Sequence, residues 1–339
     1  QQRSREALEL LDRSRQNERQ AVQQALDRYV VAGFPLQHLH AETLGDFGPT
    51  LARLNSALAE GPRYPVHNFP DDTQDQNRDH NELAGLTEAQ IHNIYASIVQ
   101  THGDQAARNA LDRQGDRVIL GLRQEDRTTD SMPGRPDGQG VYNDRLVVMW
   151  TEADGSRRVH EALRANTEPT AQYDHHAGSN GYRQNDGSGV PLAPSPGFEG
   201  VTARRKIEGA DLDGDGVRDL GRLADGTIEM RATTHANPGN LPRFSLRPTP
   251  AAVAAGQGRV QRDTNGDGYF TSTDINGVDD LNDSFKIHSG SKLNTDSAGC
   301  QTMHLDDYQS FLQAITGEKS PAAANFSTHR WQYVLVTTS

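Results

Sequence analysis

A single cysteine stands in this chain of 339 residues, and its neighbours are typical of nucleophilic chemistry. Cys300 ends the segment Ser297-Ala-Gly-Cys and follows His288 by twelve positions. A thiol attacks well only as a thiolate, and a nearby histidine is a common proton acceptor. We therefore expect Cys300 to be the nucleophile and His288 its general base. Gly299 lacks a Cβ, so the backbone N–H groups around Cys300 can turn toward an oxyanion.

The same residues leave a second interpretation open. A lone cysteine can be a small buried apolar residue, in which case His288 is an unrelated strand end. One cysteine forms no internal disulfide, so cysteine counting does not decide between oxidising and reducing compartments.

The segment DTNGDGYFTSTD, residues 263–274, has the spacing of an EF-hand-like calcium loop. Alternate oxygen ligands can converge on one hard cation, and Gly268 at position six permits the sharp turn. The expected ligands are Asp263, Asn265, Asp267, the carbonyl of Tyr269, and Asp274.

A second acidic loop spans residues 211–222. Its twelfth residue is Arg222 and not a carboxylate, so it is not a complete EF-hand loop. Its expected ligands are Asp211, Asp213, Asp215 and Asp219. Close carboxylates repel one another, and a bound cation removes that repulsion. We expect structural Ca²⁺ in both loops, and weak calcium sites fill where calcium is near millimolar, which favours a periplasmic or secreted location. The alternative is a pair of solvated Asp/Gly turns.

The elements that must position these residues change character along the chain. Helical periodicity marks the first part, and Thr87-Glu-Ala-Gln90 is a capping box that opens a helix. From residue 117 strand patterns and glycine turns dominate, with strands expected at 117–123, 145–151 and 331–338. We therefore predict an α+β protein, with an all-helical domain over residues 1–114 and a mostly β domain over residues 115–339 that contains the calcium loops.

Finer features are expected within the β part. Asp154-Gly155 and Asp225-Gly226 are typical hairpin turns, and residues 305–315 have a helical pattern. His288 would then end a strand, and the loop after it would fold Cys300 back toward the imidazole.

Composition excludes some classes of partner. The formal net charge of −12 argues against nucleic acid, since phosphate binding needs clustered Lys and Arg. No run of apolar residues approaches the length of a membrane span.

The segments "IHSG" and "SAGCQT" together resemble the catalytic segment of the L,D-transpeptidase catalytic domain, the YkuD-like family. That family carries a histidine, a loop, then Ser-His-Gly-Cys, and usually Arg or Asn two residues later. The Gly-Cys-Gln-Thr ending is similar to that of a phage-type and secreted subgroup. Ala298 replaces the motif histidine here, and Thr302 stands where the basic or amide residue is expected. The resemblance covers roughly residues 115–338.

This resemblance implies a role for each matching residue. It makes His288 the base, Ser289 the neighbour that orients it, and Cys300 the nucleophile, with Gly299 in the nucleophile turn. Substrate contacts are expected from Ser297, Gln301 and Thr302.

The implied activity is acyl transfer on peptidoglycan stem peptides, as an L,D-carboxypeptidase or endopeptidase or as an L,D-transpeptidase. A secreted antibacterial effector or lytic protein would fit the same chemistry, with a secretion apparatus and a cognate immunity or inhibitor protein as partners. The alternative from another class is a calcium-stabilised extracellular binding or adhesion module without catalysis.

Overall fold

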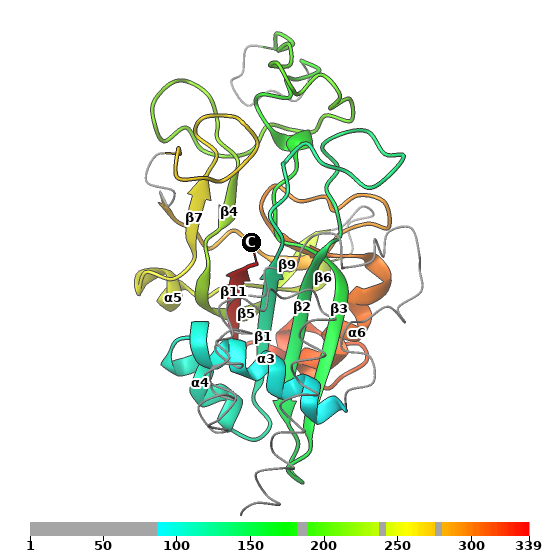
Figure 1. Ribbon diagram of the computed structural model, residues 1–339, viewed down its shortest axis with the longest axis vertical. Coiled ribbons are helices and arrows are strands. Elements are labelled where there is room, and N and C mark those ends of the chain that lie inside the picture. Colours follow the sequence, from blue (N-terminus) through cyan, green and yellow to red (C-terminus); the bar gives the residue numbers. More distant parts are fainter. Residues whose placement is uncertain (1–86, 182–188, 237–241, 275–279, 339) are drawn as a thin grey trace, which may run out of the picture.

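The described part of the chain is mostly β, with a closed eight-stranded barrel and few helices (Figure 1). The computed structural model describes residues 87–181, 189–236, 242–274 and 280–338. The predicted α+β class, with an all-helical domain ahead of a mostly β one, is therefore wrong. The helices expected before residue 87 lie outside the described residues. The barrel escaped prediction because it is closed by strands far apart in sequence, and periodicity reports only local structure.

The barrel order mixes the two ends of the described chain. β1 pairs in parallel with β11, and β9 pairs in parallel with β10, whereas the other neighbours are antiparallel. In barrel order the strands are β1 (Arg117–Arg123), β11 (Arg330–Thr337), β5 (Gly226–Ala236), β6 (Pro242–Pro248), β9 (Ile287–Ser289), β10 (Gln301–Met303), β3 (Arg157–Asn166) and β2 (Asp144–Thr151). The three strands expected from sequence are thus confirmed to within a residue. The Asp154-Gly155 hairpin between β2 and β3 is confirmed too, with Gly155 at φ 84°.

Helix α6 (Leu305–Thr316) follows β10 directly and packs against the barrel core. His304 caps its N-terminus, and Gly317, at φ 79°, ends it in the left-handed region that favours glycine. Tyr308 and Phe311 are buried in the same cluster as Trp331 of β11. Each such side chain contributes about 1.5–3 kcal/mol when it is removed from water. This packing holds the end of β10, and hence the strand that follows Cys300.

Helices α3 (Glu88–His102) and α4 (Gln105–Asp112) cover another face of the barrel. The expected capping box is confirmed, since the Thr87 and Gln90 side chains each accept the other's backbone N–H. Apolar residues of both helices share a buried cluster with β1, β2 and β11. The division of the chain at residue 114 stays a prediction, because residues 1–86 lie outside the described part.

A separate small sheet lies beside the barrel, in the order β4 (Gly221–Leu223), β7 (Arg259–Arg262), β8 (Asp280–Leu281). The Asp225-Gly226 turn joins β4 of this sheet to β5 of the barrel, so the hairpin expected there is wrong. The Asp225 carboxylate instead accepts the Thr337 N–H at 2.8 Å, which bends the chain toward β11. The remaining short helices are α5 (Pro250–Ala254), η3 (Ala171–Tyr173) and η4 (Ala323–Phe326).

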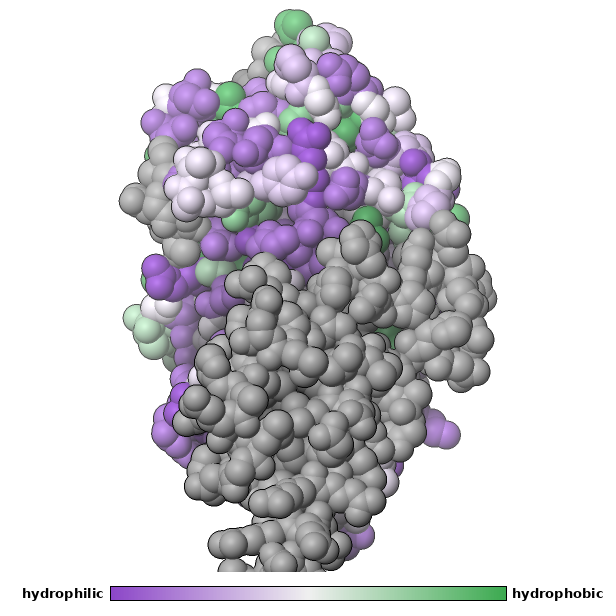
Figure 2. Space-filling view, viewed as in Figure 1, coloured by the Kyte–Doolittle hydropathy of each residue, from purple (hydrophilic) through white to green (hydrophobic). Residues whose placement is uncertain are grey.

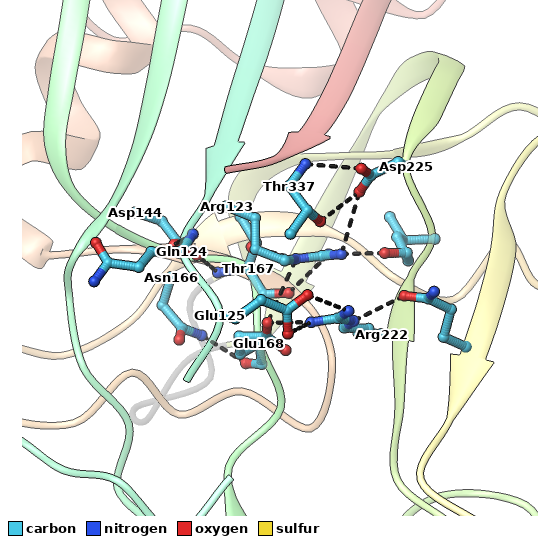
Figure 3. A network of polar contacts seen from close by, with 12 residues as sticks. Arg123, Gln124, Glu125, Asp144, Asn166, Thr167, Glu168, Arg222, Asp225 and Thr337 are labelled. Atoms are coloured by element: carbon cyan, nitrogen blue, oxygen red, sulfur yellow. Dashed lines mark hydrogen bonds and ion pairs between the residues drawn. The ribbon is translucent and has the colours of Figure 1, made fainter. Parts of the chain in front are cut away.

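A buried polar network joins the small sheet to the barrel (Figure 3). Arg222 of β4 donates to both carboxylate oxygens of Glu125 at 2.7 Å and also to Glu168. Arg123 of β1 donates to the Leu223 carbonyl of β4 at 2.7 Å. Because both arginine side chains are nearly inaccessible to water, these bonds fix where β4 lies against the barrel.

The loops that extend from the small sheet lie in the upper part of the molecule in Figure 1, together with the described part of the long segment between β3 and β4. On the face visible in Figure 2, this region is dominated by hydrophilic residues. Both acidic loops belong to it, since residues 211–219 lead into β4 and residues 263–274 leave β7.

Candidate active site and cation loops

Two neighbouring parallel strands carry the candidate base and nucleophile. His288 of β9 lies opposite Thr302 of β10 in the strand register. Cys300 immediately precedes β10, and the Gln301 N–H donates to the Lys286 carbonyl at 2.8 Å. The loop between His288 and Cys300 therefore returns the chain alongside the strand that it left.

The Cys300 thiol sits against the backbone just before β9. The Lys286 N–H donates to Sγ at 3.4 Å, and residue 300 is partly exposed. Burial of the sulfur raises the pKa of Cys300 above its ordinary value, and the Lys286 N–H opposes that shift only in part. The resting side chain is therefore a thiol and needs a base to become a nucleophile.

His288 is held as a neutral imidazole. Its ring is buried, and Nδ1 lies 2.9 Å from the Ser289 carbonyl oxygen. A carbonyl only accepts, so Nδ1 carries the hydrogen and the lone pair lies on Nε2. Burial, followed by the neighbouring His235, lowers the pKa of His288 to about 3. The ring is thus neutral at neutral pH, with its lone pair on Nε2.

His235 of β5 stacks on His288, a contact that the sequence did not reveal. The ring centroids are 3.9 Å apart and the planes differ by 12°. Burial and Lys286 lower the pKa of His235 as well, so two neutral rings stack without charge repulsion. Strand β6 separates β5 from β9 in the barrel order, so the two rings meet across it. The only sequence signal was a histidine within a strand-forming run.

The turn before Cys300 is fixed by hydrogen bonds of its own. Ser297 Oγ accepts the Gly299 N–H at 3.0 Å and donates to the Cys300 carbonyl at 2.7 Å. The Ser297 carbonyl accepts from the Thr170 N–H and hydroxyl at 2.9 and 2.8 Å. Ser297 is completely buried. These bonds make its side chain a brace for the turn.

The other two residues expected to contact substrate are also buried. The Gln301 side chain donates to the Gly299 carbonyl at 3.2 Å and accepts from the Tyr333 hydroxyl at 3.1 Å, on the core side of the barrel. Thr302 is fully buried, and its hydroxyl has no hydrogen-bond partner within the described residues. Thr302 lies beside His288 in the register, whereas Gln301 supports the nucleophile turn.

His288 and Cys300 are neighbours without a direct hydrogen bond among the described residues. Cys300 is level with Lys286, two positions before His288 along β9. Two residues span about 6.6 Å along a strand, and parallel neighbours lie about 4.8 Å apart. Proton transfer therefore needs either a side-chain rotation or one bridging water, and catalytic hydrogen bonds often tighten only when substrate binds.

Gly299→Ala is expected to destabilise the protein by about 3 kcal/mol, from a strained left-handed backbone and from overpacking. Gly299 has φ 124°, and a Cβ there would clash with the Gly221 carbonyl oxygen and the Phe285 ring. Urea unfolding measures the loss. Gly155→Ala is the matched control, because Gly155 has φ 84° but open space around a Cβ, so only the backbone strain remains. Equal losses in the two variants would contradict the tight packing of Gly299.

The acidic loop at 211–219 brings its carboxylates together. Oxygens of Asp211, Asp213 and Asp215 lie within 4.8 Å of one another, and all three residues are exposed. Asp211 accepts the Gly214 N–H at 2.8 Å and the Gly216 N–H at 3.1 Å, which curls the loop around this point. This cluster could hold a metal ion.

The fourth expected ligand of that loop, Asp219, is buried at its base. It is 1% exposed, and neither carboxylate oxygen has a hydrogen-bond partner within the described residues. Burial, followed by Asp213 and Asp215, raises the pKa of Asp219 to about 7. An orphaned buried carboxylate beside three exposed ones fits a cation site. Arg222, the twelfth residue of the predicted loop, points instead into the buried network.

The loop at 263–274 satisfies its own carboxylates. Asp263 accepts the Gly268 N–H at 2.9 Å, and Asp267 accepts the Tyr269 N–H at 2.8 Å. Asp274 accepts from the Thr264 N–H at 2.9 Å and the Thr271 N–H at 2.7 Å. Asn265 Oδ1 accepts the Asp267 N–H at 2.9 Å. Among the described residues, the carboxylates that come together are therefore those of the 211–219 loop. Calcium binding at 263–274 stays a prediction.

The two loops meet where β4 and β7 pair. The Asp263 N–H donates to the Leu220 carbonyl at 3.1 Å, so the start of β4, just after Asp219, lies beside the end of β7, just before Asp263. Asp174 and His176 lie near this junction, where the His176 ring contacts Gly266. Burial, followed by Asp174, raises the pKa of Asp263 to about 7. Asp174 in turn binds His176 Nδ1 at 3.1 Å.

Comparisons with family models, with curated proteins and with solved structures found no match to this chain. Across the described residues, no helix is both long and apolar enough to cross a membrane.

Proposed function

We propose that this protein is a cysteine-dependent acyl-transfer enzyme that acts on peptidoglycan stem peptides in the periplasm or outside the cell. One observation carries the proposal: Cys300 directly precedes β10, the parallel neighbour of the strand β9 that holds His288, and the imidazole donates from Nδ1, which leaves the lone pair on Nε2. The resemblance of their sequence segments to the L,D-transpeptidase family supplies the substrate class.

In the proposed reaction, His288 Nε2 removes the proton of Cys300, and Sγ attacks the carbonyl carbon of a stem-peptide bond next to a D-amino acid. The tetrahedral intermediate collapses to a thioester as His288 returns the proton to the departing amine. Water or the amine of another stem peptide then attacks the thioester and releases the thiol.

The developing oxyanion needs a donor close to Sγ. The Gly299 N–H already donates to Ser297 Oγ, so the backbone N–H of Cys300 itself is the better candidate. The brace of Ser297 and Gln301 around this turn holds that group still while charge develops.

Thr302 stands where the resembling family carries a basic or amide residue that grips a substrate carboxylate. With that group absent, we favour hydrolysis, as an L,D-carboxypeptidase or endopeptidase, over cross-linking. A lytic protein or antibacterial effector would use the same chemistry, with a secretion apparatus and an immunity protein as its partners.

Calcium is proposed as a structural ion in this enzyme. The orphaned Asp219 carboxylate and the convergent Asp211, Asp213 and Asp215 oxygens would hold it at one loop. The loop at 263–274 is the second proposed site. Calcium at these positions neutralises carboxylates and stiffens the small sheet, and it takes no part in the acyl transfer.

A second candidate is a calcium-stabilised extracellular binding or adhesion module in which Cys300 is incidental. Two observations favour it: the raised pKa of the thiol, and the lack of a direct His288–Cys300 hydrogen bond among the described residues.

Mass spectrometry of stem peptides separates these functions. Purified peptidoglycan peptides are incubated with the full chain and calcium, beside Cys300→Ala and Cys300→Ser. We expect loss of a terminal D-amino acid, cleavage of a cross-link or exchange of the terminal residue only with the intact thiol. An intact peptide profile with the folded wild-type protein would reject the enzyme and leave the binding module. An equal change with both variants would reject the nucleophile.

A further inference from the structure

The strand that follows the 211–219 loop touches the nucleophile turn. Gly221 of β4 lies two residues after Asp219, and its carbonyl oxygen is in contact with Gly299 so closely that a Cβ would not fit. The Phe285 ring crowds the same position, so it also leaves no room for a Cβ at Gly299. Gly299 directly precedes Cys300, so the position of β4 limits where the thiol can lie.

The connection from Asp219 to this contact is stiff. Asp219 and Ala210 exchange two backbone hydrogen bonds of 2.9 and 3.1 Å, which close the base of the loop. The Arg262 side chain of β7 donates to the Asp219 carbonyl at 3.2 Å, and Arg262 pairs with Gly221 in the β4–β7 register. A displacement of Asp219 therefore passes to Gly221 over a single residue.

The 211–219 loop concentrates negative charge. Three exposed carboxylates converge within 4.8 Å, and a fourth, from the 1% exposed Asp219, has no donor within the described residues. A buried carboxylate without a hydrogen-bond partner is costly to keep charged. A hard divalent cation would neutralise the converging carboxylates and give the Asp219 carboxylate a partner, because it binds six to eight oxygen ligands.

We infer that one divalent cation, of the calcium class, binds Asp211, Asp213, Asp215 and Asp219 and fixes the Cys300 turn through the Gly221–Gly299 contact. The cation draws Asp219 toward the exposed carboxylates and locks the loop base, so β4 presses on Gly299. Without it, repulsion among the four carboxylates loosens the base, and the turn that bears the thiol relaxes. The importance of this coupling rests on the proposed function, since a fixed turn matters most if Cys300 is a nucleophile. The test does not depend on that function.

The test measures the thiol directly. In the described arrangement the Lys286 N–H holds Sγ in a desolvated position, where a small electrophile reacts slowly. We expect calcium to slow alkylation of Cys300 by iodoacetamide about fivefold or more relative to chelator, the low end of typical coupling between sites. Isothermal titration of the full chain with calcium chloride reports binding in parallel.

Two matched variants assign the effect to a loop. Asp213→Asn with Asp215→Asn removes two exposed carboxylates of the cluster, and Asp267→Asn removes one exposed carboxylate of the other loop. Protection by calcium should vanish in the first variant and persist in the second. Circular dichroism checks that each is folded, which their exposed positions favour.

The remaining outcomes overturn the inference. Calcium binding that leaves the alkylation rate unchanged would remove the coupling to Cys300. Calcium titration curves that are the same for the wild type and for the Asp213/Asp215 variant would show that the 211–219 loop is not the binding site. Protection that depends on Asp267 instead would place the coupling in the other loop. None of these readouts uses peptidoglycan, so a negative stem-peptide assay and a negative result here are distinguishable.

Discussion

His288→Ala is expected to lower the rate of thioester formation on a stem peptide by about 100-fold, the low end of the usual contribution of a general base, because the lowered pKa of His288 makes it a weak base. The thiol of Cys300 has a raised pKa and does not ionise by itself near neutral pH. Its proton must therefore pass to His288 Nε2 as the bond forms. Single-turnover kinetics with a stem peptide measure the loss, with the mass of the acylated protein as the readout.

The pH profile gives this prediction a signature that misfolding would not produce. The pKa of His288 is about 3 and that of Cys300 is raised, so the wild-type pair stays in its reactive thiol and neutral imidazole form between about pH 5 and pH 8. Its rate should be flat over that range. In His288→Ala the rate must follow the thiolate fraction and rise about tenfold per pH unit.

His102→Ala is the control, because His102 is an exposed histidine in the last turn of α3. It should keep both the rate and the flat profile. A His288→Ala variant that is folded and retains the flat profile would contradict a role for His288 as the base.

Arg222→Ala is expected to destabilise the protein by about 3–5 kcal/mol, the usual effect of removing one partner of a buried ion pair. The Arg222 side chain is 3% exposed, and the change removes the nearest cation of both Glu168 and Glu125, leaving Glu168 with Arg123 at 3.6 Å. Burial already raises the pKa of Glu168, and Arg222 is the first of the groups that oppose the shift. Urea unfolding followed by tryptophan fluorescence measures the loss.

Two further variants make the Arg222 result interpretable. Arg113→Ala breaks an exposed pair with Asp116 and should cost at most about 1 kcal/mol. Glu168→Leu combined with Arg222→Leu removes both charges of the closest pair and should recover part of the loss, because apolar replacement of a buried pair is often neutral, while Arg123 then loses its contact with Glu168. A cost for Arg222→Ala no greater than for Arg113→Ala would mean that the network does not hold β4 in place.

Local structure was predictable where one short segment decides it. The Thr87 capping box, the Asp154-Gly155 turn and the periodicity of α6 each depend on residues within a few positions, and each is confirmed. The barrel was not predictable, because β1 finds its partners in β2 and in the distant β11. For the same reason Asp225-Gly226 misled: its residues suit a hairpin, but the two strands that it joins belong to different sheets.

The candidate site divides in the same way. Spacing alone singled out His288, Cys300 and the acidic loops, because each lies within a short segment. The stacking of His235, the brace of Gln301 against Tyr333 and the contact of Gly299 with Gly221 depend on strands brought together by the barrel and the small sheet. The local sequence pattern around these residues does not indicate which distant residues they contact.

The place of β11 between β1 and β5 has a consequence for how the chain folds. Val118 pairs with Gln332, so the barrel closes over about 200 residues of sequence, and such non-local pairing slows folding. During synthesis or threading from the N-terminal side, β1 and β5 remain open edges until β11 emerges. The cysteine turn and its histidine strand precede β11, so they cannot be held in a finished barrel before the last described strand arrives. Nucleophilic competence is therefore among the final properties that a newly made molecule acquires.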